Sequence, residues 1–328
     1  MRFPLAIAAG ALLGCTTPSP DPESVAWSAP ADEAALPWLL SVWGPSSTEL
    51  FAVGGSPEEG FLTRYDGSEW RAEDVGEVPL LNWVFGFQVD DVTVVGNGGT
   101  ILHWDGDTWE KETSPTTQNL WGVWGTSPDN RWAVGGNAVA ADGVPTLLHD
   151  DGTGWSTVEL PPLMRPKVYA LFKVWGTDEN NVYAVGQRGT VLHWDGSVLT
   201  EELVGTGEDL ISLWGSGRDR IMAVGGRSNG VVVLWNGDAW SSLAFDNEFP
   251  LPALNGIWMD PLGQSFVVGI EGTIAQITPD STRYARQSID SRLTFHGVFG
   301  DGERITAVGG NLANPMGPFR GILRTRPK

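Results

Sequence analysis

The chain has 328 residues, enough for one large all-β domain or two ordinary domains. Its 40 acidic and 20 basic residues give a formal net charge of −20. This charge argues against nucleic-acid binding and against adsorption to anionic lipid head groups, because both need a cationic surface. The 43 Gly and 17 Trp predict many short strands, tight turns and a core built on aromatic rings.

The first residues predict a processing signal. Met1 and Arg2 precede an apolar stretch, 3–14, that is too short to span a bilayer. It ends in Leu-Leu-Gly-Cys15, which resembles the lipobox of bacterial lipoproteins. The resemblance implies a signal peptide over 1–14 and a lipidated (palmitate-bearing) Cys15 that begins a Pro/Ser-rich tether over 15–23. An ordinary signal peptide is the alternative.

The localisation follows from the same motif. Cys15 is the only cysteine, so no intramolecular disulfide can form. Thr16, rather than Asp, follows Cys15. The common sorting pattern of lipoproteins then implies the outer membrane. We expect a cell-envelope protein that contacts the membrane through its lipid anchor alone.

A repeat fills the rest of the chain. Each copy has an aliphatic residue, an aromatic residue and usually Gly, followed about ten residues later by Val-Gly. The repeated aromatics are Trp43, Phe85, Trp124, Trp175, Trp214, Trp258 and Phe299. Successive Val-Gly glycines lie 42, 39, 51, 39, 44 and 40 residues apart. A period near 40–45 residues is typical of propeller blades.

Each repeat divides into four predicted strands, called a to d. In the third copy these begin near Leu120, Arg131, Thr146 and Trp155. An Asp-Gly or Asn-Gly pair connects strands c and d in most copies, which is a strong hairpin signal. Four residues after that Asp or Asn comes the first aromatic or leucine of strand d, as in Asp105 and Trp109.

The seventh repeat lacks a strand d before the chain stops. Residues 24–28, which contain Trp27, precede the first strand a and have no partner of their own. The sequence therefore predicts a seven-bladed β-propeller of four-stranded antiparallel blades over 24–328, whose N-terminal strand completes the last blade and removes two sheet edges. A right-handed β-solenoid is the alternative fold.

The turn between strands c and d resembles the Asp-box of BNR-type propellers. The whole repeat, over about 25–328, is similar to the broad bacterial Asp-box/YVTN-like propeller superfamily. One departure is the four-residue spacing from Asp105 to Trp109, which is one residue shorter than in the usual Asp-box. The Trp-Gly strand at 120–125 also faintly resembles tectonin-type lectin repeats. These resemblances imply a fold and leave the function open.

Candidate catalytic or metal-binding residues mostly recur in several repeats. His103, His149 and His193 hold one repeat position in three blades, so they cannot converge on one ion. The turn aspartates, such as Asp105 and Asp195, are explained by hydrogen bonds to local backbone. We expect no metal and no cofactor. No Ser-His-Asp arrangement, phosphate loop or HExxH motif is present, so an enzyme, with a glycosidase as its nearest form, is the least favoured alternative.

The remaining candidates lie at the ends of strands. Successive antiparallel strands reverse direction, so the b–c and d–a loops share one face of the disc. Variable residues on a rigid scaffold are where binding sites usually lie. The candidate binding residues are Asn97, Asn137, Arg165, Lys167, Gln187, Arg188, Arg227, Glu271 and Asn311.

We therefore expect a non-catalytic, monomeric recognition module that binds an envelope or extracellular protein or peptide through this face. A lectin-like module is the alternative. Trp38 and Trp83 lie outside the repeated aromatic positions, so they are the predicted exposed platforms for sugar rings.

Overall fold

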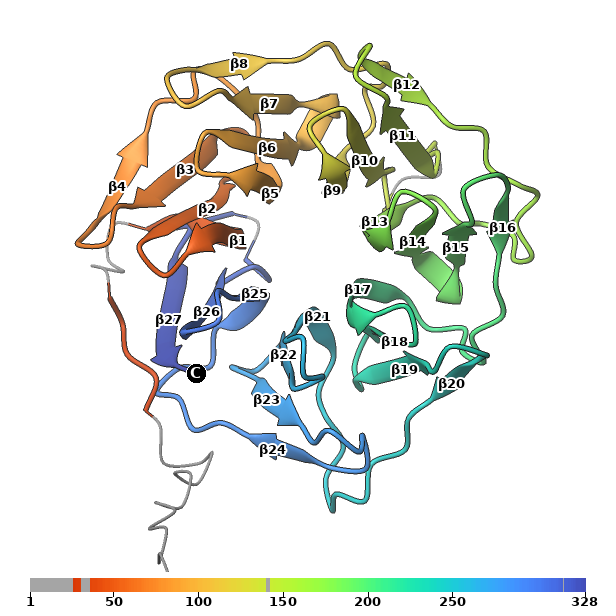
Figure 1. The fold of residues 1–328 in the computed structure, drawn as a ribbon. Coiled ribbons are helices and arrows are strands. Elements are labelled where there is room, and N and C mark those ends of the chain that lie inside the picture. Colours follow the sequence, from red (N-terminus) through yellow and green to blue (C-terminus); the bar gives the residue numbers. More distant parts are fainter. Residues whose placement is uncertain (1–25, 31–35, 140–141, 315) are drawn as a thin grey trace, which may run out of the picture.

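The computed structural model describes residues 26–30, 36–139, 142–314 and 316–328. Seven antiparallel sheets stand radially around a common axis (Figure 1), which confirms the predicted β-propeller. Cys15, the predicted signal peptide and tether, and residues 24–25 of the predicted closing strand lie outside the described residues.

Each blade is a meander in chain order. Blade 1 comprises β1 (Trp38–Ser46), β2 (Glu49–Gly55), β3 (Gly60–Tyr65) and β4 (Trp70–Glu73). Blade 2 comprises β5 (Leu81–Gln88), β6 (Asp91–Gly96), β7 (Ile101–Trp104) and β8 (Trp109–Lys111). Blade 3 comprises β9 (Leu120–Ser127), β10 (Asn130–Gly135), β11 (Thr146–Asp150) and β12 (Trp155–Thr157). Blade 4 comprises β13 (Leu171–Asp178), β14 (Asn181–Gly186), β15 (Val191–Trp194) and β16 (Leu199–Glu201).

The last three blades follow the same order. Blade 5 comprises β17 (Leu210–Gly217), β18 (Arg220–Gly225), β19 (Val231–Trp235) and β20 (Trp240–Ser242). Blade 6 comprises β21 (Leu254–Met259), β22 (Ser265–Gly269), β23 (Ile274–Ile277) and β24 (Tyr284–Arg286). Blade 7 comprises β25 (Thr294–Gly300), β26 (Arg304–Gly310) and β27 (Gly321–Pro327). Short 3-10 turns, η3 (Asn97–Gly99) and η4 (Gln187–Gly189), follow β6 and β14.

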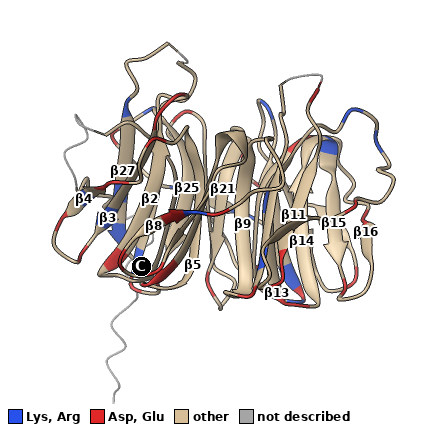
Figure 2. Ribbon diagram, turned by 90° about the horizontal axis from the view of Figure 1, so that it is seen from above, with Lys and Arg blue, Asp and Glu red and all other residues tan. Residues whose placement is uncertain are grey.

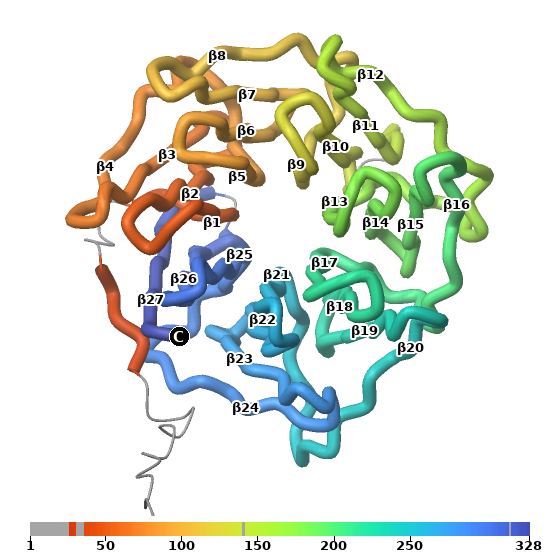
Figure 3. The backbone as a smooth tube through the Cα atoms, viewed as in Figure 1, coloured from red at the N-terminus to blue at the C-terminus, as the bar shows by residue number. Residues whose placement is uncertain are grey.

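The N-terminal side of the chain closes blade 7. Ser28 and Thr325 of β27 form an antiparallel bridge with backbone hydrogen bonds of 2.8 and 2.9 Å. The described segment 26–30 runs beside β27 (Figure 3). The half-buried Trp27 packs on the core cluster that contains Ile305 and Ile322. The closure is therefore where the sequence predicted it. Among the described residues it consists of one bridge rather than a longer strand.

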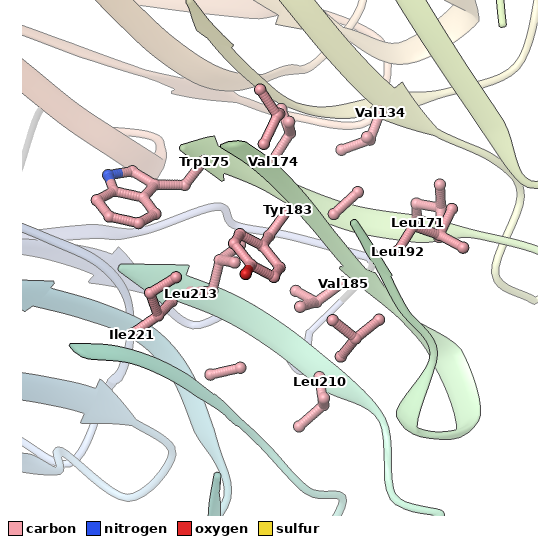
Figure 4. Close-up of a cluster of buried hydrophobic side chains, with 14 of the residues drawn as sticks. Val134, Leu171, Val174, Trp175, Tyr183, Val185, Leu192, Leu210, Leu213 and Ile221 are labelled. Carbon is pink, nitrogen blue, oxygen red and sulfur yellow. The ribbon is translucent and has the colours of Figure 1, made fainter. Parts of the chain in front are cut away.

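The repeated aromatics of strand a pack between blades. Each of four tryptophan rings lies over the glycine that follows the repeated aromatic of the next blade. A Cβ on that glycine would come within 2.5–2.8 Å of the ring, in the pairs Trp43–Gly86, Trp124–Gly176, Trp175–Gly215 and Trp258–Gly300. Figure 4 shows one such junction, with Trp175 and Tyr183 of blade 4 beside Leu210 and Leu213 of blade 5.

Strand a, the inner edge strand of each sheet, carries a β-bulge near its start in every blade. A bulge leaves one residue out of the ladder and redirects its side chain. The bulged residues are Leu40, Asn82, Trp121, Phe172, Ile211, Asn255 and His296. Non-repeated side chains are thereby placed beside the axis.

The loops sort into two faces, as the strand directions predict. We call the side with the b–c loops and d–a connections the loop face; it lies uppermost in Figure 2. The a–b and c–d turns form the turn face, toward which β27 runs. In the part of the chain that the structure describes, no helix is long and apolar enough to cross a bilayer.

Candidate functional site

The predicted binding residues come together only in part. Six of them lie in neighbouring loops of blades 3 to 5, which we call the blade 3–5 sector: Asn137, Arg165, Lys167, Gln187, Arg188 and Arg227. The other three are separate, with Asn97 on blade 2, Glu271 on blade 6 and Asn311 on blade 7.

Two of the sector residues hold loops together. Arg165 Nη1 donates to the backbone oxygens of Arg188 and, at 2.5 Å, of Thr206. The buried Gln187 accepts from the Tyr169 N–H at 2.8 Å and donates to the Ala138 oxygen at 2.9 Å. These side chains fix the shape of the surface, because their polar groups are already occupied.

A second contact links blades 4 and 5. The buried Asp209 accepts from the Arg188 N–H at 2.9 Å and pairs with the Arg227 guanidinium. The Arg227 side chain is 67% exposed. The nearly buried Asp209 carboxylate thus holds the exposed Arg227 guanidinium at the surface.

Arg188 stands at the tip of its turn in an unfavourable conformation. Its φ is 60°, whereas the same turn in blade 2 has Gly98 at φ 63°. Glu271 repeats the geometry in blade 6 with φ 57°. A long charged side chain at a position that favours glycine costs conformational energy, and such positions cluster at functional sites.

Exposed apolar side chains gather beside these cations. Eight large apolar side chains are exposed among the described residues, and they include Val139, Val144, Met164, Leu203 and Met316 on the loop face. The first four belong to the blade 3–5 sector or its border. Val144 also lines a cavity of about 500 Å³, together with 114–118, 145–146 and 157. Apolar patches with a polar rim mark interaction surfaces.

Asn97 and Asn311 take structural roles. The Asn97 side chain accepts from Asn82 Nδ2 at 3.0 Å. Asn311 Oδ1 accepts from Trp38 Nε1 at 2.8 Å, and Asn311 Nδ2 donates to the Pro318 oxygen. Asn311 therefore holds the b–c loop of blade 7 over Trp38.

The two tryptophans predicted as exposed sugar platforms are not exposed. Trp38 is 7% exposed and meets Phe319 edge-on, so that prediction is wrong. Trp83 is half-buried, and Lys173 Nζ lies 3.0 Å from its ring centroid. The sequence rule failed because loop packing and the bulge, rather than the repeat, place these rings.

The bulged strands place a cation beside the axis that sequence reasoning missed. Lys173 is 3% exposed, and its Nζ donates to the Trp121 oxygen at 3.2 Å. Burial lowers the pKa of Lys173 well below its usual range. Burial, and then the charge of Lys173, lower the pKa of His296 to about 4. The sequence did contain a signal for this residue, because the repeat position of Lys173 holds Ser, Gly or Trp in the other blades.

A second cavity lies at the opposite end of the axis. It measures about 460 Å³, and its lining includes the repeated aromatics Trp175, Trp214, Trp258 and Phe299. Lys328 reaches its rim, where Nζ pairs with Asp260 at 2.7 Å. Trp175 and Trp258 also pack between blades, so this cavity belongs to the inter-blade packing at the turn face.

The recurrent histidines each bond within their own blade. His103, His149 and His193 meet Asp91, Asn130 and Asn181 at 3.1, 2.9 and 3.0 Å. They do not converge, as the sequence predicted.

The turn aspartates bind local backbone, also as predicted. Asp105 accepts from the N–H groups of Asp107 and Thr108 at 2.9 and 2.8 Å. These bonds, that from Thr108 first, hold the pKa of Asp105 below its usual range.

Replacing Asp105 with asparagine should leave stability at pH 7 nearly unchanged and flatten its acid dependence. Asn236 makes the same two backbone contacts in blade 5, at 3.0 Å. Because the folded pKa of Asp105 is depressed, its stabilisation is present above the unfolded value near 3.9 and is lost as pH falls through the folded value. The melting temperature from pH 7 to pH 2.5 measures this. The reverse variant, Asn236→Asp, should steepen the acid dependence; an unchanged slope in both variants would contradict the account.

Comparison with known proteins supports the fold alone. No protein-family model and no curated protein matches the sequence. The structure is similar to virginiamycin B lyase from Staphylococcus aureus (TM-score 0.72, 11% identity, 92% of this chain and 98% of that chain). It is similar to the WD40 propeller domain of Doa1 (0.68, 10%, 93% and 97%). It is also similar to YCF48 bound to D1 peptide (0.53, 15%, 91% and 97%).

Proposed function

We propose that the chain is a non-catalytic lipoprotein of the bacterial cell envelope, anchored through Cys15 in the outer membrane, whose loop face binds a protein or peptide. The observation that carries the binding role is the blade 3–5 sector, where exposed Met164 and Leu203 stand beside exposed Lys167 and Arg188. Protein interfaces combine apolar anchors with a polar rim in this way.

The rigidity of the sector supports recognition of one defined partner. Arg165, Gln187 and Asp209 tie its loops together through the hydrogen bonds described above. A surface that is already ordered loses less conformational entropy when it binds.

The chemistry of the surface indicates the chemistry of the partner. Leu203 and Val144 are 75% and 58% exposed and offer apolar contacts. Arg188 and Arg227 offer positive charge in a protein whose net charge is −20. We infer a partner segment that carries apolar residues next to acidic ones.

The structural neighbours support the same role. A WD40 propeller and a propeller bound to a peptide are both similar to this chain. A lyase is similar as well, so catalysis is the alternative outcome of the test.

Photo-crosslinking from single positions of the full chain in its native membrane tests the proposal. A crosslinker at Leu203 should capture one defined partner, identified by mass spectrometry. A crosslinker at Leu262, which is 88% exposed on the turn face, should not capture it.

Side-chain substitutions then measure the contact. Met164→Ser and Leu203→Ser should each weaken binding of the purified partner about tenfold, because central apolar contacts dominate interface energy. Leu262→Ser is the matched control and should bind normally. Equal capture by the crosslinkers at Leu203 and Leu262, or turnover of the captured molecule, would contradict the proposal.

A further inference from the structure

Lys173 carries a buried amine without a counter-charge. Lys328 pairs with Asp260, whereas no ion pair involves Lys173 among residues 26–30, 36–139, 142–314 and 316–328. Its Nζ has one carbonyl partner, the Trp121 oxygen, and the face of Trp83. Burying an ammonium group is costly unless it is paired.

The local backbone is shaped to put the amine in this place. Lys173 directly follows the bulged Phe172 on β13. A Cβ on Gly122 of blade 3 would come within 3.2 Å of the lysine stem. The stem thus crosses blade 3 over a glycine and reaches Trp83 on blade 2.

The side chains around the amine are only partly buried. The bulges lie at the start of strand a, which is its loop-face end. Trp83, Trp121, Phe172 and His296 around this end are half-buried rather than fully buried. The chain therefore presents aromatic and imidazole surface to a ligand that approaches along the axis.

His296, the bulged residue of β25 in blade 7, contributes a neutral imidazole. Its Nδ1 donates to the Leu40 oxygen at 2.8 Å, so Nε2 of the neutral ring is an acceptor. Burial, and then the charge of Lys173, keep the pKa of this imidazole low.

We propose that the axial end of the loop face binds a carboxylate group, held by the ammonium of Lys173 beside Trp83. One cation matches a monoanion better than a phosphate dianion. The aromatic rings suit a carboxylate on an apolar stem. The source is an acidic residue or C-terminus of the partner peptide, in which case the inference rests on the proposed function, or a free small carboxylate.

Lysine NMR of the full chain in detergent micelles tests the site. The sequence has four lysines, 111, 167, 173 and 328, so ¹³Cε signals are few, and Lys173→Met assigns the relevant one. Benzoate and acetate should shift the Lys173 signal, benzoate at the lower concentration. Inorganic phosphate should shift it least. A Lys173 signal that none of the three probes moves would overturn the inference.

Variants separate a binding role from a structural one. Lys173→Met should reduce benzoate affinity at least tenfold without lowering the melting temperature, because an apolar side chain removes an uncompensated charge. Lys173→Arg should retain part of the affinity. Lys111→Met, at an exposed site on β8, is the control and should bind normally. Loss of stability with unchanged affinity in Lys173→Met would show a structural role only.

The peptide arm distinguishes the two sources. A partner peptide found by crosslinking should lose at least tenfold affinity when its acidic groups are converted to amides, and the loss should vanish in Lys173→Met. If neither amidation of the peptide nor Lys173→Met changes the affinity, the carboxylate does not come from the peptide, and the proposed function is unaffected. A benzoate response without any peptide partner would support the carboxylate site and contradict the proposed function.

Discussion

Replacing Asp150 with alanine should lower the free energy of unfolding by about 3–5 kcal/mol. The Asp150 and Arg131 side chains are 3% and 8% exposed, and their closest approach is 2.5 Å. Without Asp150, the Arg131 guanidinium would stay buried with part of its charge uncompensated. Breaking a buried ion pair from one side costs far more than losing an exposed pair.

The Arg131 cluster joins blades 2 and 3. Arg131 also bonds Thr93 at 3.0 Å and Glu112 at 2.8 Å. Glu112 accepts from Trp155 Nε1 at 2.6 Å, and Trp155 lies under the guanidinium at 5.1 Å. Loss of Asp150 should therefore loosen a contact between blades as well as one within blade 3.

Urea unfolding with a double-mutant cycle measures this prediction. Arg131→Met combined with Asp150→Ala should be less destabilising than the sum of the single variants, because the two residues are directly coupled. The half-exposed Arg64–Glu49 pair is the control and should couple by about 0.2–1 kcal/mol. Additive effects at Arg131 and Asp150 would contradict the argument.

Replacing Gly215 with alanine should destabilise the protein by about 1–3 kcal/mol, the usual range for overpacking. A Cβ there would lie 2.6 Å from the Arg220 backbone oxygen and 2.7 Å from the Trp175 ring. The carbonyl belongs to a paired strand and the ring is closed in between blades, so neither can move freely. We therefore expect looser packing between blades 4 and 5 and a lower melting temperature.

Gly217 provides the matched control on the same strand. A Cβ at Gly217 meets nothing within 4 Å. Gly217→Ala should be neutral or stabilising by a few tenths of a kcal/mol, because it reduces the freedom of the unfolded chain. Thermal unfolding of both variants decides the matter. Similar losses at the two positions would show that general strand propensity, rather than the inter-blade contact, sets the cost.

Repetition made most of the architecture predictable. A blade cannot bury its aromatic rings alone, so a repeat of Trp-Gly strands has to stack against copies of itself. Hence the strand order, the turn aspartates, the two faces and the position of Trp27 followed from spacing. Residue-by-residue pattern sufficed because each of these features needs only local or nearest-neighbour contacts.

The candidate site was less predictable, since it depends on residues that break the repeat. Sequence reasoning placed Arg188 and Arg227 on the loop face, where the structure has them, but it did not show that Gln187 is buried or that Arg165 is bound to backbone. These outcomes depend on how loops of different blades meet. The residue pattern within one repeat carries no information about contacts between loops of different blades.

By itself, the sequence determined the ring, its order and its closure, because burial of repeated apolar rings leaves few alternatives. Only the tertiary structure decided the burial of Trp38, the Arg131–Asp150 pair and the isolated Lys173. Each of these depends on groups that are 19 to more than 200 residues apart and meet at a bulge, a loop or a blade boundary. Their energies are set by local desolvation, which exists only once the whole ring has closed.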